Sequence, residues 1–153
     1  MLVRAGLTTA LVDGLFSSVL SVIYGSTPVR LFQGVAATLI GTTALTGGTR
    51  TALVGVLMHV TVAFTWSAVF LFVALRASWV RRLMASRYGV LKVAALYGPM
   101  IWIVMSWVVI PVLMRRPPRI TLRWWIQLLG HFPFVGVPIV ASVRYRMNEQ
   151  GIP

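Results

Sequence analysis

The segment RTALVGVLMHVTVAFTWSAVFLFVALR, residues 50–76, determines how the whole chain is interpreted. Between Arg50 and Arg76 lie 25 residues without a single Asp, Glu, Lys or Arg. An α-helix rises about 1.5 Å per residue, so this run is longer than the roughly 30 Å hydrocarbon core of a bilayer. The segment therefore predicts a membrane-spanning helix over residues 51–75.

One face of this helix carries small or polar side chains four residues apart. These positions are Thr51, Gly55, His59, Ala63 and Ser67. In a membrane, small residues at this spacing allow a second helix to approach closely. Gly6, Ala10 and Gly14 repeat the spacing near the start of the chain. We therefore expect the first helix to pack against the face that contains Gly55.

The composition agrees with a membrane protein. Of the 153 residues, 58% are hydrophobic and only 10% are charged, whereas soluble domains carry about 25% charged residues. The net charge of +12 would suggest nucleic acid in a soluble protein. Here the arginines lie between apolar segments, where cations contact lipid phosphates. We expect membrane lipids, including anionic lipid, as partners, and no nucleic acid.

Three further apolar segments predict spans at about residues 5–24, 89–114 and 122–143. The sequence thus predicts an all-α, polytopic integral membrane protein with four transmembrane helices in a single membrane domain. Pro99 lies inside the third span and is expected to kink it, and Pro133 with Pro138 should make the last span irregular.

A shorter apolar segment follows the first span. Pro28 suits the first turn of a helix and Gly41 suits its end, so residues 28–41 predict an interfacial or re-entrant helix. Residues 31–48 are uncharged over 18 positions, which leaves a fifth span as the alternative. Residues 76–88 are predicted to form a basic loop.

Four spans place both termini and the 76–88 loop on one side of the membrane. That side carries seven arginines and Lys92, and the other side carries six arginines. The positive-inside rule then predicts cytoplasmic termini in a multi-pass protein of the bacterial inner membrane.

Three ionisable side chains lie inside the predicted spans: Asp13, His59 and His131. Each lies eight or nine residues from a flanking arginine, which corresponds to a depth of roughly 12–14 Å. All three are therefore expected to meet near the middle of the bilayer. An ionisable residue at that depth is costly and is a functional candidate by default.

Several roles remain open for these side chains. His59 and His131 could ligate haem iron, or one of them the magnesium of a (bacterio)chlorophyll, and bound lipid is expected in any case. Asp13 and a histidine could relay protons. Alternatively, Asp13 bonds hydroxyls such as those of Thr9 or Ser17, and the histidines bond backbone groups.

No catalytic residues and no metal site are predicted. The chain has no Cys, no G-x-S-x-G, no H-E-x-x-H and no phosphate-binding glycine-rich loop. We expect a non-enzymatic accessory subunit that packs with other membrane subunits, for example in a photosynthetic reaction centre–light-harvesting assembly or a respiratory complex. The alternative is a small oligomeric transporter or channel that uses Asp13 and the histidines.

The order of these features resembles a group of small bacterial four-helix inner-membrane proteins. The shared positions are Gly6, Asp13, Pro28, Gly47–Gly48, Gly55, His59, Trp66, Tyr97–Gly98, Met105 and Pro111. The resemblance covers roughly residues 5–113. It implies a four-helix membrane fold and carries no activity with it.

Overall fold

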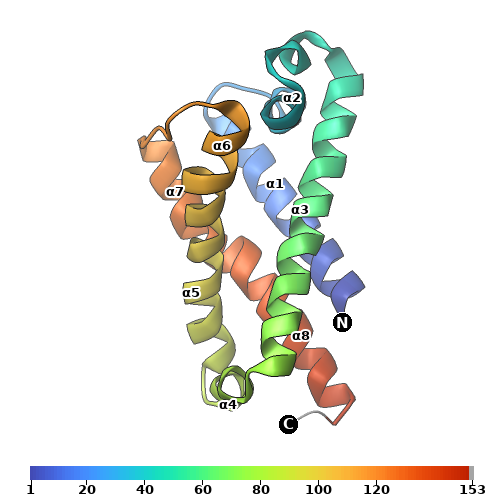
Figure 1. Ribbon diagram of the computed structural model, residues 1–153, viewed down its shortest axis with the longest axis vertical. Coiled ribbons are helices and arrows are strands. Elements are labelled where there is room, and N and C mark those ends of the chain that lie inside the picture. Colours follow the sequence, from blue (N-terminus) through green and yellow to red (C-terminus); the bar gives the residue numbers. More distant parts are fainter. Residues whose placement is uncertain (152–153) are drawn as a thin grey trace.

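The computed structural model describes residues 1–151, and this part of the chain contains helices and turns but no strand. Four helices are long and apolar enough to cross a membrane: Leu2–Ile23, Gly48–Arg76, Gly89–Met114 and Leu122–Glu149 (Figure 1). The first two are α1 and α3. The predicted all-α architecture with four spanning-length helices is confirmed, and it indicates a multi-pass membrane protein.

The third long helix consists of three pieces: α5 (Gly89–Val104), the π-helical turn η2 (Met105–Val109) and α6 (Ile110–Met114). Pro111 lies two residues after the end of the π turn. A proline ring clashes with the carbonyl four residues earlier, and the wider π turn gives it room. At Pro99 the helix α5 is not interrupted, and the kink expected there stays a prediction.

The fourth long helix is built in the same way, from α7 (Leu122–His131), the π turn η3 (Phe132–Gly136) and α8 (Val137–Glu149). Pro133 lies in the π turn and Pro138 just after it, so the irregularity expected from these prolines is present. The helix extends beyond the predicted limit of residue 143.

The short helix is α2 (Pro28–Ile40). Its N-terminus is capped by the Thr27 hydroxyl, which accepts from the Arg30 N–H at 3.1 Å. It ends at Gly41, whose φ of +81° favours glycine. A 3₁₀ turn, η1 (Thr42–Thr46), then leads to α3. The break at Gly41 excludes a fifth span over residues 31–48.

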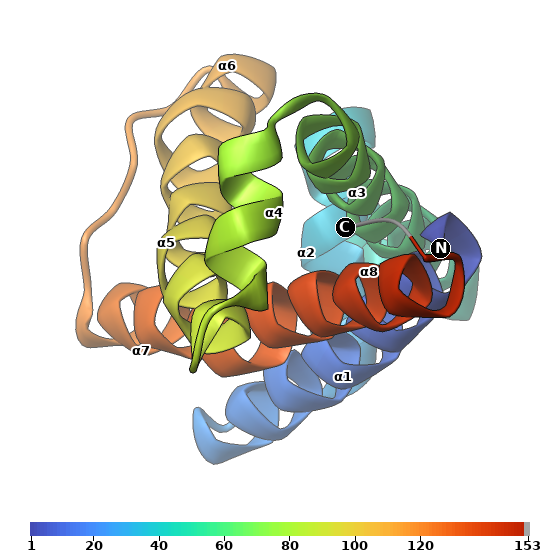
Figure 2. The same ribbon diagram turned by 90° about the horizontal axis from the view of Figure 1, so that it is seen from below.

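The predicted 76–88 loop contains an additional helix, α4 (Ser78–Ala85). It lies across one end of the molecule, below α5 and α3 (Figure 2). Val80 and Met84, one turn apart, are buried against the neighbouring helices. Arg81 donates to the carbonyls of Ala74 and Leu75 at the C-terminus of α3, at 3.1 Å each. This amphipathic pattern spans only eight residues, which is why it resembled a charged loop.

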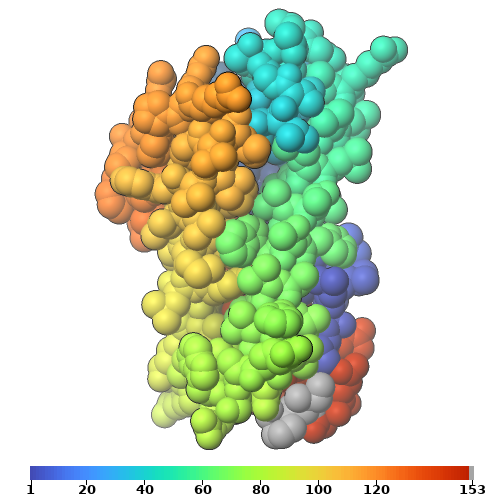
Figure 3. Space-filling view, viewed as in Figure 1, coloured from blue at the N-terminus to red at the C-terminus, as the bar shows by residue number. Residues whose placement is uncertain are grey.

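The main hydrophobic core lies toward the α4 end of the molecule. It consists of side chains from α1, α3, α4, α5, η3 and α8: Ala5, Phe70, Ala74, Val80, Met84, Val93, Ala94, Ile101, Val135, Ile139, Val140, Val143 and Met147. Toward the other end, α3 and α5 separate, and α2 and α6 contact each other there (Figures 1 and 3). The core therefore closes one end, and a cavity occupies the other half.

The outward faces of the long helices are apolar. Leu7, Leu11 and Leu15 form an exposed stripe on α1, and Leu53 with Leu57 continues this pattern on α3. Such side chains match the hydrocarbon of a bilayer.

Candidate functional site

A cavity of about 780 Å³ lies among α1, α2, α3 and the two long helices that contain the π turns η2 and η3. Its volume falls in the range of roughly 300–1,000 Å³ that is typical of small-molecule sites. It extends from the middle of the long helices to the loop at residues 115–121. The three ionisable residues singled out from the sequence all line it.

Asp13 of α1 and His59 of α3 form the central pair of this site. The His59 Nδ1 lies 3.9 Å from the Asp13 Oδ2, and both side chains are more than four-fifths buried. The Asp13 carboxylate also interacts electrostatically with His131 of α7. The structure thus places around one cavity three residues that are separated by 46 or more positions. Their common depth in a bilayer stays a prediction.

A backbone carbonyl fixes the protonation of one His59 nitrogen. The His59 Nε2 lies 3.0 Å from the Ala10 carbonyl oxygen. Because a carbonyl oxygen can only accept, Nε2 carries a hydrogen and donates it. In a neutral imidazole the Nδ1, which faces Asp13, then has no hydrogen and carries a lone pair. A second proton on His59 would convert this contact into an ion pair.

Small residues make the approach of α1 to α3 close enough for this contact. A Cβ at Gly14 would lie 3.4 Å from the His59 Nε2, and one at Gly6 would collide with the Phe64 ring. Ala10 supplies the carbonyl. Gly55, by contrast, packs against the backbone of Phe32 in α2.

Two further positions of the small face on α3, Ala63 and Ser67, are buried. The Ser67 hydroxyl has no hydrogen-bond partner among the described residues. The small face therefore serves two neighbours: its Gly55 region contacts α2, and its later part faces α1.

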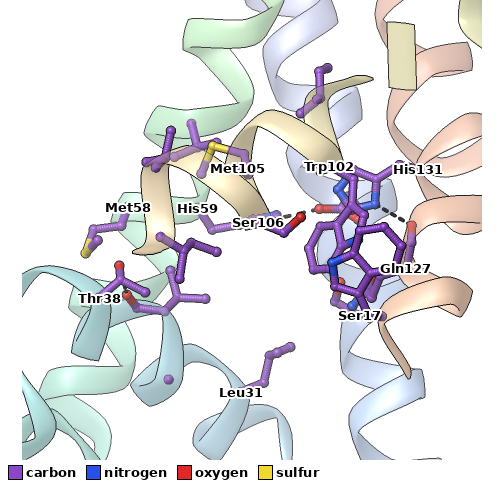
Figure 4. Close-up of a pocket in the computed structure, with 18 of the residues that line it drawn as sticks. Ser17, Leu31, Thr38, Met58, His59, Trp102, Met105, Ser106, Gln127 and His131 are labelled. Carbon is purple, nitrogen blue, oxygen red and sulfur yellow. Dashed lines mark hydrogen bonds and ion pairs between the residues drawn. The ribbon is translucent and has the colours of Figure 1, made fainter. Parts of the chain in front are cut away.

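His131 sits at the last turn of α7, where the helix passes into η3. Its Nδ1 donates to the Gln127 carbonyl at 2.7 Å, and its ring packs against Trp102 with centroids 4.9 Å apart (Figure 4). Gly98 allows α5 to approach, because a Cβ there would meet the His131 carbonyl. With Nδ1 engaged as a donor, Nε2 of the neutral ring keeps a lone pair.

Most of the buried polar atoms that lack a hydrogen-bond partner gather in this cavity. Six such side-chain atoms occur in residues 1–151, and five belong to cavity-lining residues: Thr9 Oγ1, Asp13 Oδ1, Trp102 Nε1, Trp124 Nε1 and Gln127 Oε1. Each unsatisfied buried group costs about 1–3 kcal/mol. These atoms are almost fully covered, and the residues that carry them surround one cavity.

Sequence reasoning missed Gln127 as part of the site. The available signal was its position four residues before His131, which places both side chains on one face of a helix. The sequence does not single out Trp102 or Trp124 either. Their unpartnered indole N–H groups become visible only once the helices are placed in space.

The geometry does not fit a haem held by two histidines. The His59 Nε2 is committed to the Ala10 carbonyl, and its Nδ1 faces a carboxylate. Only the His131 Nε2 is left as a ligand atom. Among residues 1–151, no group of three or more His, Asp or Glu side chains is placed to hold a metal ion. Ligation of a pigment by His131 alone stays a prediction.

Comparisons of the chain with protein-family models, curated proteins and solved structures return no match, so the site is interpreted from its own residues.

Proposed function

We propose that this chain is a small multi-pass carrier that binds a solute within the membrane and passes protons across the membrane through Asp13 and His59, with or without that solute. The observation that carries this proposal is the cavity in which Asp13, His59 and His131 meet several unpartnered polar atoms. A merely structural role for Asp13 would have given its carboxylate hydrogen-bond partners. Its Oδ1 has none among the described residues.

The Asp13–His59 pair is suited to holding and releasing one proton. With Nε2 donating to Ala10, a neutral His59 places the lone pair of its Nδ1 opposite an oxygen of the Asp13 carboxylate. A proton on either group removes that repulsion. The separation of 3.9 Å exceeds a direct hydrogen bond, so a bridging hydroxyl or water, or a small side-chain shift, would complete the transfer.

The two π turns favour a carrier over a fixed pore. Met105, Ser106 and Val109 of η2 and Val135 of η3 line the cavity. Interrupted helices are common at transporter binding sites, where irregular backbone lines a cavity. The hydrophobic core closes the opposite end. Access from that end requires movement of the long helices, and the π turns provide points where they can bend.

The charge distribution supports an orientation. Both termini and α4 lie on the side with seven arginines and Lys92, which we propose to be the cytoplasmic side of a bacterial inner membrane. The cavity then extends toward the outer face.

An accessory subunit of a larger complex is the second candidate. Its support is the exposed apolar surface of the long helices together with very short segments outside them. Lipid accounts for the same surface. No described residue selects a photosynthetic or respiratory assembly as host, and both remain predictions.

Proton flux in sealed vesicles tests the proposal. The purified chain is reconstituted with a pH-sensitive dye inside, and a potassium gradient with valinomycin drives protons inward. We expect flux that falls about tenfold or more in Asp13→Asn. Glu149→Gln is the matched control, because the only other acid is exposed and pairs with Arg146 at 2.8 Å. Equal flux in wild type and Asp13→Asn would contradict the proposal.

A further inference from the structure

We infer that the ligand of this cavity is an anionic amphiphile. Its phosphate or carboxylate group is held by Arg30, Arg116, Arg119 and Arg123 at one end of the cavity, and its body lies along the apolar wall. This inference rests on the proposed function, since it names the chemical class of the solute. We call the four side chains the arginine mouth.

The arginine mouth draws on three segments of the chain. Arg30 lies in the first turn of α2, Arg123 in the first turn of α7, and Arg116 and Arg119 in the connecting loop. All four line the cavity. Pro117 and Pro118 lie between Arg116 and Arg119 and restrict the backbone of the loop. Residues so far apart in sequence converge here on one opening.

The protein has no carboxylate available to neutralise this mouth. Its two acids are Asp13 and Glu149. Asp13 is buried beside His59, and Glu149 is bonded to Arg146 on α8. Arg123 lies over the Tyr24 ring at 5.5 Å, a contact that adds no negative charge. Guanidinium groups bind phosphate and carboxylate through paired N–H donors, so an external anion is the matching partner.

Two further features favour an anion at this end. The helices α2 and α7 both begin here, and helix N-termini carry positive partial charge. The indole N–H of Trp124, next to Arg123, is buried without a partner. Trp124 itself lines the cavity.

The depth of the cavity requires more than a small inorganic anion. Arg123, Gln127 and His131 lie on successive turns, so the mouth and the Asp13–His131 level are about 12 Å apart. The cavity wall beside this stretch is largely apolar and includes Leu31, Met58, Trp102 and Met105 (Figure 4). An ion at the mouth would leave this wall unfilled.

Polar residues along the cavity extend the description of the ligand. Gln127 and Thr9 are 8% and 2% exposed, and the Gln127 Oε1 and Thr9 Oγ1 both lack partners. Gln127 lies one turn from His131 toward the arginine mouth, and Thr9 lies one turn from Asp13. A hydroxyl or amide group on the body of the amphiphile would suit these residues.

The arginines themselves supply the control. Arg50 and Arg115 lie at the same end of the molecule but do not line the cavity. Contact with lipid headgroups at the bilayer surface would involve these two as much as the arginine mouth. A ligand bound in the cavity would contact the arginine mouth and not Arg50 or Arg115.

The test measures binding of dodecyl phosphate to the chain in phosphatidylcholine nanodiscs, below the concentration at which the probe forms micelles. Tryptophan fluorescence is the readout, because Trp102 and Trp124 line the cavity. We expect saturable binding that weakens about tenfold or more in Arg30→Gln/Arg119→Gln. The control Arg50→Gln/Arg115→Gln should stay within about twofold of wild type. Circular dichroism establishes that both variants retain their helices.

Two other probes identify the source of the anion. Inorganic phosphate should bind much more weakly than dodecyl phosphate, and dodecyl trimethylammonium should not bind. Equal affinity for inorganic phosphate would contradict an amphiphilic ligand and would identify a free anion as the ligand. Equal affinity for the ammonium compound would contradict anion binding by the arginine mouth. An equal loss of dodecyl phosphate affinity in Arg50→Gln/Arg115→Gln would contradict it as well.

A measurement on the unmodified chain covers the case in which the variant does not fold. Raising the ionic strength from about 0.01 M to about 1 M shortens the screening length from roughly 30 Å to 3 Å. Dodecyl phosphate binding should weaken, and unchanged affinity would overturn the inference. Asp13-dependent proton flux uses no anionic probe. Intact flux without dodecyl phosphate binding would therefore remove this inference and leave the proposed function.

Discussion

The His59 imidazole is held between two parts of α1: its Nε2 donates to the Ala10 carbonyl at 3.0 Å, and its Nδ1 lies 3.9 Å from the Asp13 carboxylate. Gly14 lies on the same turn, and a Cβ there would be in van der Waals contact with the ring, 3.4 Å from the Nε2. The carboxylate itself is poorly satisfied, because its Oδ1 has no partner among the described residues. This arrangement places a costly charge where a ligand or a proton can reach it.

Replacing the carboxylate should leave the fold intact or stabilise it. In Asp13→Asn the buried charge is removed while the shape is kept, so the free energy of unfolding should be unchanged or rise by about 1 kcal/mol. Thermal unfolding in detergent, followed by circular dichroism, measures this. A loss of more than about 1 kcal/mol would mean that Asp13 anchors the helices through hydrogen bonds.

The two buried glutamines should respond to the same substitution with opposite signs. The Gln33 Nε2 donates to the Gly48 carbonyl at 3.1 Å, so Gln33→Met should lower the free energy of unfolding by about 1 kcal/mol. The Gln127 Oε1 has no hydrogen-bond partner. The backbone carbonyl of residue 127, which accepts from His131, is retained in Gln127→Met. That variant should be as stable as wild type or more stable. Equal destabilisation by both would show that the Gln127 side chain is satisfied in the folded protein.

The α2–α3 contact depends on the absence of a side chain at Gly55. A methyl group there would meet the Phe32 carbonyl, so Gly55→Ala should force the two helices apart and cost about 1–3 kcal/mol. Gly34 in α2 has open space around its Cβ position. Gly34→Ala should therefore stabilise by about 0.5–1 kcal/mol through helix propensity. Unfolding midpoints of the two variants check this contrast, and similar midpoints would contradict the packing described.

The sequence was informative where a single physical requirement dominated. The uncharged run at 51–75 and the flanking arginines predicted four long helices, since the bilayer sets their length. Pro28 and Gly41 predicted α2 through their backbone preferences. The spacing of Asp13 and His59 from Arg4 and Arg50 predicted a common depth.

What the sequence did not reveal depends on contacts between distant segments. The helix α4 needs Val80 and Met84 to be buried by its neighbours, which the local pattern of arginines obscures. The π turn at 105–109 lies between two prolines, Pro99 and Pro111, that looked alike in the sequence. Unpartnered atoms such as the Gln127 Oε1 are defined only by what surrounds them in space.

The central claim is that a cavity open at the end with the arginine mouth reaches Asp13. The chain contains no Cys, so single cysteines can be introduced without background. Ser17→Cys lies in the cavity, one turn from Asp13, and Thr61→Cys is an exposed position on α3 outside it. A membrane-impermeant thiosulfonate is added to either side of oriented vesicles. Labelling of Ser17→Cys from the arginine side, with Thr61→Cys unreactive from both sides, is the predicted result. An unreactive Ser17→Cys, or equal reaction of the two, would contradict it.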